Sequence, residues 1–265
     1  MQQLAGMNLI VGLALAGAKV ARVGLALVGR DTPDVDALIK ELGDIRSDAT
    51  MLLNVPERFN EIFSGLGWIC YDGMNHVLAT ECVQKAESGD VNGAEQLLIE
   101  SVTESWIRTH ILWMHSVRAF RIRVPLAEKA ARDYGEGRYY ASTLVVLSLI
   151  DGLVNDLHER QVGFFSKDIA IEAWDSLSAH EGGLGKLSRL MQSKRAKTTD
   201  EEITIPFRHG IVHGRDLGYD NKAVSAKAWN ALFALKEWAT RAESGTLERP
   251  NIPERSFREV LRAFS

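Results

Sequence analysis

Residues 139–157, YYASTLVVLSLIDGLVNDL, constrain the fold most, because their apolar side chains would cover nearly every face of a helix. Such a helix is stable where other elements surround it. The β-branched residues at 143–146 would also suit a strand, but the length of the run favours a helix. We therefore predict that this run is the central helix of a helical bundle.

Apolar residues at three-to-four spacing extend the helical pattern on both sides of this run. A shorter helix is expected at residues 169–177, residues 198–202 are expected to form a loop, and Asp220 or Asn221 is expected to cap the last core helix. The remaining predicted helices cover residues 33–45, a stretch from Pro56 towards residue 85, residues 97–117 after a turn at 88–94, residues 126–134 and about residues 221–243. The sequence thus predicts an all-α protein.

The basic stretch before Pro125 marks the predicted boundary between two helical domains. We expect an N-terminal helical domain at residues 31–125 and a unit of four to five helices at residues 126–243. Residues 1–30 are very apolar, which favours a buried or partner-facing helix and leaves membrane association or export as the alternative. Residues 244–265 are expected to form a tail with a short amphipathic helix.

The composition limits the kinds of site that this chain can carry. The net charge of −4 provides no global basic field, so any contact with nucleic acid must come from a local patch. The two cysteines, Cys70 and Cys82, are typical of buried reduced thiols in a cytosolic protein. His110 and His115 would point about 140° apart on a helix and suit one metal ion poorly. We expect a cytoplasmic location, no metal site and no cofactor.

Arginine, histidine and glycine crowd together at residues 206–216, PFRHGIVHGRD, between two apolar runs. Arginine holds phosphate through a planar fork, and histidine exchanges a proton near neutral pH. The spacing of arginine and histidine proves little alone, since Arg108 and His115 stand seven apart in an ordinary helical segment. The glycines at 210 and 214 distinguish the second segment, which indicates phosphate chemistry.

Arg208-His209-Gly210-Ile211-Val212-His213-Gly214 resembles the signature of HEPN domains, all-helical modules in which Arg, a polar residue, three further residues and His follow one another. The resemblance covers about residues 126–243. It implies metal-independent cleavage of RNA, of toxin or defence type, at the interface of a homodimer. His213 would be the acid or base, Arg208 the phosphate clamp, and His209 would orient the scissile phosphate. An antitoxin or a nucleotidyltransferase would be a partner; a membrane is not expected.

Four further basic residues are predicted to contact RNA. Arg215 lies beside the motif, and Lys186, Arg189 and Lys194 belong to the densest basic cluster of the chain. A solvated helix face is the alternative for that cluster. Asp151 lies in the apolar run, where a carboxylate normally needs a partner. Pairing with Arg208 would give Asp151 an orienting role, and a local cap or a solvent-facing position is the alternative.

The spacing of Arg208 and His213 raises a geometric problem. On a straight helix they point about 140° apart, so one regular helix does not bring both to one phosphate. Either the backbone bends, which Gly210 permits, or two chains pool their motifs at a dimer cleft. The alternative function is a catalytically silent module that binds RNA or protein, in which Arg208 anchors an acidic side chain. An unrelated helical protein is the third possibility.

Overall fold

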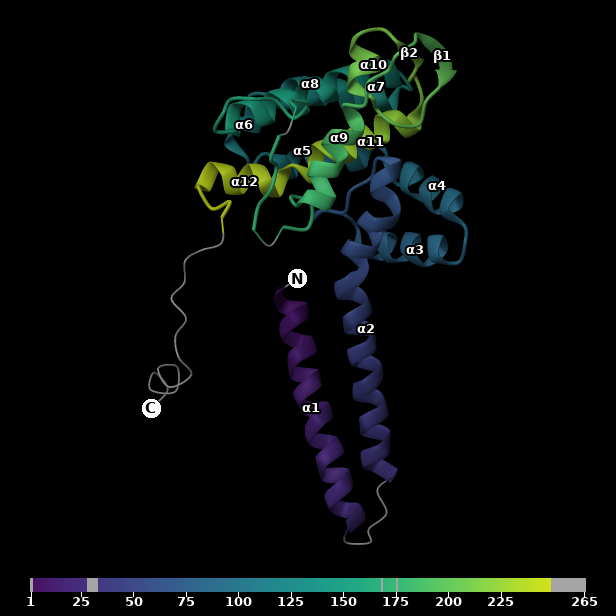
Figure 1. The fold of residues 1–265 in the computed structure, drawn as a ribbon, viewed down its shortest axis with the longest axis vertical. Coiled ribbons are helices and arrows are strands. Elements are labelled where there is room, and N and C mark those ends of the chain that lie inside the picture. The colour runs from purple at the N-terminus through teal and green to yellow at the C-terminus, as the bar shows by residue number, and fades with distance from the viewer. Residues whose placement is uncertain (1, 28–32, 168, 175, 249–265) are drawn as a thin grey trace. The chain divides into compact units, whose positions relative to one another are not determined.

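A computed structural model describes residues 2–27, 33–167, 169–174 and 176–248 of the chain. The protein is all-α, with one small two-stranded sheet in the described part (Figure 1). The described residues form two compact units. The first contains the residues up to Phe63 together with Met74–Leu98, and the second contains Ser64–Gly73 and the residues from Ile99 onward.

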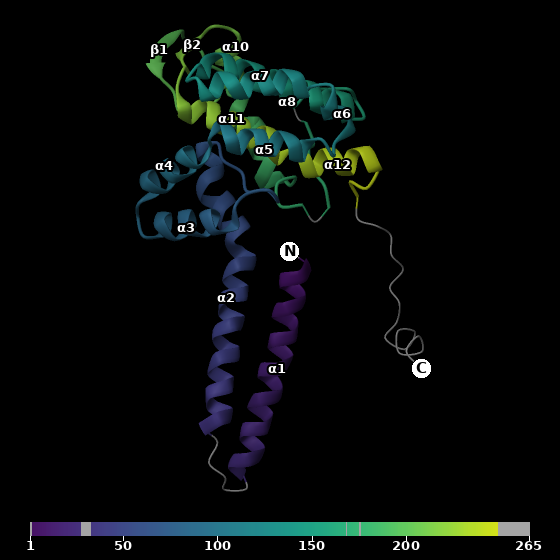
Figure 2. The ribbon, with the colours of Figure 1, turned by 180° about the vertical axis from the view of Figure 1, so that it is seen from behind.

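The first unit is built on a helical hairpin. Helix α1 (Gln2–Leu27) packs along α2 (Pro33–Phe63), as both views show, and Arg22 Nε lies 2.7 Å from Asp36 Oδ1 (Figures 1 and 2). Helices α3 (His76–Glu87) and α4 (Val91–Ser101) follow. The apolar segment predicted at residues 1–30 therefore forms a helix over its described part.

Pro56 does not open a helix, so that prediction is wrong. It lies inside α2, where it removes one backbone donor and leaves a carbonyl of the previous turn without its usual partner. Val55, Phe59 and Phe63 are buried around it, and their burial offsets this loss. The predicted continuation towards residue 85 is also wrong, because a short turn, η1 (Ser64–Leu66), and an extended segment separate α2 from α3.

The second unit surrounds α8 (Tyr139–Leu157), which contacts five other helices, so its predicted central place is confirmed. By length and hydropathy α8 would also suit a membrane span, but much of its surface is buried against these neighbours. Trp229 Nε1 donates a 3.0 Å hydrogen bond to Ser142 Oγ and joins α8 to α11. The other helices here are α5 (Glu104–Met114), α6 (Arg118–Arg121), α7 (Val124–Gly135), α9 (Lys186–Met191), α10 (Arg208–Val212), α11 (Lys222–Ala234) and α12 (Lys236–Ser244), with a π-helical turn η2 (Glu181–Gly185).

The division into units differs from the boundary expected at residue 125. Pro125 lies in the first turn of α7, where its missing N–H costs nothing, and does not mark a linker. Helix α5 packs on α7, and Tyr134 Oη donates to the Val102 carbonyl at 2.9 Å. Asn230 holds both backbone groups of Ile69, accepting from its N–H at 2.9 Å and donating to its carbonyl at 3.1 Å. The second unit therefore includes residues on the N-terminal side of Pro125.

One strand precedes α10 in the sequence and another follows it. Strand β1 (Thr199–Glu202) pairs in parallel with β2 (Asp216–Gly218), so the loop expected at residues 198–202 is a strand for most of its length. Asn221 caps α11 by accepting from the Val224 N–H at 3.0 Å, which confirms one of the two predicted caps. The last core helix is divided at Leu235 into α11 and α12.

The helix expected at residues 169–177 is absent from the described part of that segment. Two of its backbone donors bond to residues that follow them in the chain: the Ala173 N–H to the Ala179 carbonyl and the Trp174 N–H to the Leu247 carbonyl, each at 2.8 Å. These bonds replace the bonds within one turn that a helix needs. The amphipathic helix expected in the tail falls among residues 249–265, outside the described residues.

Cys70 and Cys82 are buried thiols, as predicted. Burial, with a smaller contribution from Asp72, raises the pKa of the Cys70 thiol to about 12. Burial likewise raises the pKa of Cys82 to about 11. Because the thiolate is the reactive form, both thiols are protonated and unreactive near neutral pH.

Candidate functional site: a basic pocket beside α10

Residues 208–212 form the single short helix α10, which begins at Arg208. Ile211 is buried and anchors the helix to the second unit. Gly214 has a φ of +63°, a left-handed conformation that glycine adopts without strain. The chain turns there, and the Arg215 N–H bonds back to the Gly210 carbonyl at 2.7 Å. This turn holds Arg215 against the last turn of α10.

Arg208 extends from α10 towards α8. Its Nη2 lies 3.8 Å from Asp151 Oδ2, and the carbon of its guanidinium lies 5.6 Å from the centre of the Phe165 ring. Asp151 Oδ1 also accepts from the Phe165 N–H at 3.2 Å. Arg208, Asp151 and Val212 all line one pocket of about 430 Å³. The structure thus brings Asp151 to Arg208.

His209 and His213 line a different pocket, of about 570 Å³. Their positions differ by one turn of α10, and their ring centres lie 4.6 Å apart with an angle of 67° between the ring planes. Lys194, Arg195 and Arg215 complete the charged part of the pocket, and among the described residues that line it none is acidic. This basic pocket is the strongest anion-binding feature around the motif.

The structure separates the two residues that were expected to share one phosphate. Within one chain Arg208 and His213 line different pockets, as the angle between five-residue neighbours on a helix requires. Of the residues expected to contact RNA, Arg215 and Lys194 line the basic pocket. Lys186 and Arg189 are exposed on α9 and do not line it.

The sequence analysis did not predict the contact between Arg195 and Asp216, which holds the basic pocket together. Arg195 Nε donates to Asp216 Oδ1 at 2.9 Å, and Asp216 is fully buried. The guanidinium of Arg195 also lies over the Phe207 ring, 4.7 Å from its centre. Arg215 Nη1 donates to the Arg195 carbonyl at 2.7 Å, so the two arginines are fixed to each other. Arg195 and Asp216 are far apart in sequence, and no spacing rule links them.

Gly210 has a role other than bending the helix. A Cβ at this position would lie 1.8 Å from Asp216 Oδ2 and 2.6 Å from Asp216 Cγ. The hydrogen of glycine lets the buried carboxylate pack directly against α10. In the described part of the chain Asp216 Oδ2 has no hydrogen-bond partner, so Arg195 holds this carboxylate through Oδ1 alone.

The charges around His209 affect its protonation. Loss of solvent around its ring lowers the pKa of His209 below the ordinary histidine value, and the positive charges of His213, Arg208, Arg215 and Lys194 lower it further. A neutral imidazole is able to accept a proton from a substrate. The same positive charges attract an anion. The pocket therefore combines a proton acceptor with an anion site.

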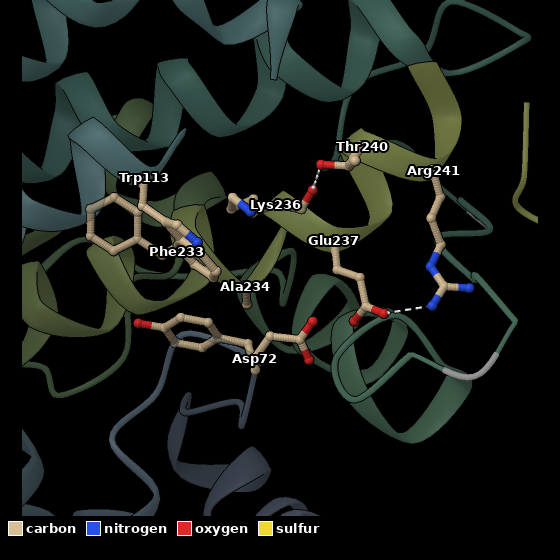
Figure 3. A pocket seen from close by; sticks show the side chains of 9 residues that line it. Asp72, Trp113, Phe233, Ala234, Lys236, Glu237, Thr240 and Arg241 are labelled. Carbon is tan, nitrogen blue, oxygen red and sulfur yellow. Dashed lines mark hydrogen bonds and ion pairs between the residues drawn. The ribbon is translucent and has the colours of Figure 1, made fainter. Parts of the chain in front are cut away.

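A third pocket, of about 210 Å³, lies beside α12 (Figure 3). The ammonium of Lys236 lies 4.0 Å from the centre of the Trp113 ring, a cation–π contact. Glu237 accepts from Ser176 Oγ at 2.6 Å and from Arg241 Nη2 at 2.8 Å, the second of which Figure 3 shows. Lys236, Glu237 and Arg241 already interact with other groups of the chain, so we assign no ligand to this pocket.

The described residues contain no group of three or more His, Cys, Asp or Glu side chains that could hold a metal ion. The imidazoles of His209 and His213 both line the basic pocket, and imidazole is a side chain that can give or take a proton. The arrangement can therefore bind an anion and exchange protons with it.

Comparison of the chain with protein-family models, with curated proteins and with solved structures finds no match. The resemblance of residues 208–214 to the HEPN signature stays a prediction from the sequence. The function is argued below from the geometry of the basic pocket.

Proposed function

We propose that this protein binds RNA at the basic pocket and cleaves it without a metal ion. The observation that carries the proposal is the pair His209 and His213, one turn apart, among Lys194, Arg195 and Arg215. Phosphodiester cleavage needs groups that move protons and cations that stabilise the negative charge on the phosphorane oxygens. The pocket provides both within a few residues.

The reaction uses the ribose 2′-hydroxyl as the nucleophile. The 2′-oxygen bonds to phosphorus as its proton passes to His209, whose lowered pKa keeps the imidazole neutral. The bond from phosphorus to the 5′-oxygen then breaks as that oxygen takes a proton from His213. The products are a 2′,3′-cyclic phosphate and a 5′-hydroxyl end. Arg195, Arg215 and Lys194 stabilise the phosphorane, and arginine does so through two parallel hydrogen bonds.

The clamp predicted for Arg208 does not belong to this one-chain site. Arg208 lies beside Asp151 in the other pocket. It would reach a phosphate at His213 in a dimer whose second chain supplied the arginine, as the HEPN resemblance implies. Within one chain the clamp falls to the cations of the basic pocket.

The pairing of Arg208 with Asp151 favours a second function, a module that binds RNA without cleaving it. In that function Arg208 is a structural anchor, as its distance of 3.8 Å from the carboxylate allows. The basic pocket would still attract the phosphate backbone. The two functions differ in the fate of the RNA.

Incubation of the purified protein with end-labelled RNA in EDTA tests the proposal. We expect cleavage that leaves 2′,3′-cyclic phosphate ends and binding that weakens as salt rises. Binding without cleavage would establish the second function. A protein that neither binds nor cleaves RNA would overturn both.

The pH dependence of cleavage gives a further expected result. Because the pKa of His209 is lowered, the neutral base persists to lower pH, and the acidic limb of kcat/KM should lie below the ordinary histidine value of about 6.5. The Lys194→Gln variant removes one positive charge, so the pKa of His209 rises and the limb should move to higher pH. Lys197→Gln, three residues along and outside the pocket, is the matched control. A limb that stays in place in Lys194→Gln would contradict this account.

A further inference from the structure

The pocket on the α8 side of α10 has the size and lining of a site for a flat polar ligand. Its volume of about 430 Å³ falls in the usual range for small-molecule pockets. One part of its lining is apolar and the other is polar. The apolar part is Leu144, Leu147 and Val212, and the polar part is Ser148, Asp151, Asn155 and Arg208.

The Arg208–Asp151 pair is set too wide for a direct hydrogen bond. The Nη2 to Oδ2 distance of 3.8 Å exceeds hydrogen-bond length, and the two side chains are 30% and 35% exposed. Asp151 is fixed from behind, since its Oδ1 accepts from the Phe165 N–H and lies 2.0 Å from where a Cβ of Gly163 would be. The pocket thus presents a fork of donors beside a fixed acceptor.

This arrangement matches guanine better than the other bases. The guanine edge carries the O6 acceptor followed by two donors, N1–H and N2–H₂, and its N7 is a second acceptor. Arginine pairs with O6 and N7, and a carboxylate accepts from N1–H and N2–H₂. Adenine, cytosine and uracil each place only one donor group beside an acceptor on that edge. Guanine therefore makes at least one more hydrogen bond with Arg208 and Asp151.

We propose that this pocket, named here the α8-side pocket, is a guanine-binding subsite for RNA whose backbone lies in the basic pocket. The proposal rests on the proposed function for the RNA itself. Arg208 and His209 are consecutive residues that line the two pockets. An RNA strand that crosses α10, a helix about 10 Å across, would pass from one pocket to the other. Phosphate binding and base recognition then occur on opposite sides of one short helix.

Binding of uncleavable 2′-O-methyl oligonucleotides tests the subsite without depending on catalysis. We expect an oligonucleotide with one guanine to bind on the order of 10-fold more tightly than the same sequence with adenine, measured by fluorescence anisotropy. Inosine, which lacks the N2 amino group, should lose much of this preference. Because inosine changes the RNA and not the protein, this arm is independent of folding.

The variant Asp151→Asn replaces one acceptor oxygen by a donor, so the preference for guanine over adenine should fall about 10-fold. Asp156→Asn is the matched control, because Asp156 lies on the same helix, pairs with Arg123 at 2.7 Å and does not line the pocket. It should keep the preference.

The outcomes separate the subsite from the proposed function. If the wild-type protein prefers guanine and Asp151→Asn loses that preference, the subsite is supported. This holds even if the wild-type protein cleaves no RNA. Cleavage or binding with no base preference overturns the subsite and leaves the basic pocket as the RNA site. Failure to bind any oligonucleotide overturns both.

Discussion

Replacing His213 with alanine is expected to lower kcat/KM for RNA cleavage by about 10²- to 10⁴-fold, because the leaving 5′-oxygen loses its proton donor. His213 is exposed in the basic pocket, so the melting temperature should stay close to that of the wild-type protein. Initial rates at several RNA concentrations and a thermal melt measure both effects. The pair of results distinguishes a catalytic loss from a folding defect.

His115→Ala is the matched control, since His115 is an exposed histidine outside the pocket. It should cleave RNA at the wild-type rate. If His213→Ala also cleaved RNA at the wild-type rate, the proposed mechanism would be wrong, whatever the protein binds.

His213→Ala, used together with Arg208→Ala, distinguishes a one-chain site from a site shared by two chains. In a shared site, Arg208→Ala would abolish cleavage, and mixing it with His213→Ala would restore part of the rate. In the one-chain site Arg208 lies in the α8-side pocket. Arg208→Ala should then change the base preference far more than the rate, and mixing the two variants should give no gain beyond the sum of their separate rates.

The parts of the fold that the sequence predicted well are those with a strong local signal. The apolar run at residues 139–157 required burial on most sides, and α8 has it. Asn221 stood at the start of an apolar stripe and caps α11. At Pro56 the local signal was misleading, because burial of the flanking residues keeps α2 continuous through a residue that usually begins a helix.

The candidate site could be predicted only in part. The sequence located the motif and the angle between Arg208 and His213, and the structure shows the consequence of that angle in two separate pockets. The pair of Arg195 and Asp216 had no sequence signal, because 21 residues separate its members. The parallel pairing of β1 with β2 places Thr199 opposite Asp216 and so brings the chain after Arg195 close to Asp216. The sequence analysis expected a loop at β1 and therefore did not predict this pairing. Long-range contacts of this kind arise from the fold and not from local spacing.

Gly210→Ala tests this packing and is expected to destabilise the protein by about 3 kcal/mol. Alanine in an exposed helix normally stabilises by about 0.5–1 kcal/mol over glycine. Here the new Cβ would lie 1.8 Å from Asp216 Oδ2 and 2.8 Å from Arg195 Cγ. The carboxylate must move, and its 2.9 Å bond to Arg195 is strained or lost while it stays buried. Urea unfolding measures the change in free energy.

Gly43→Ala supplies the control for helix propensity, because a Cβ at this position in α2 meets no atom within 4 Å. It should leave the protein as stable as before or slightly more stable. The cause of the Gly210 effect follows from a double-mutant cycle with Asp216→Ala. If the clash with the carboxylate is the cause, Gly210→Ala costs much less in the Asp216→Ala background than alone. Additive losses would mean that Gly210 is needed for a reason other than the close approach of Asp216.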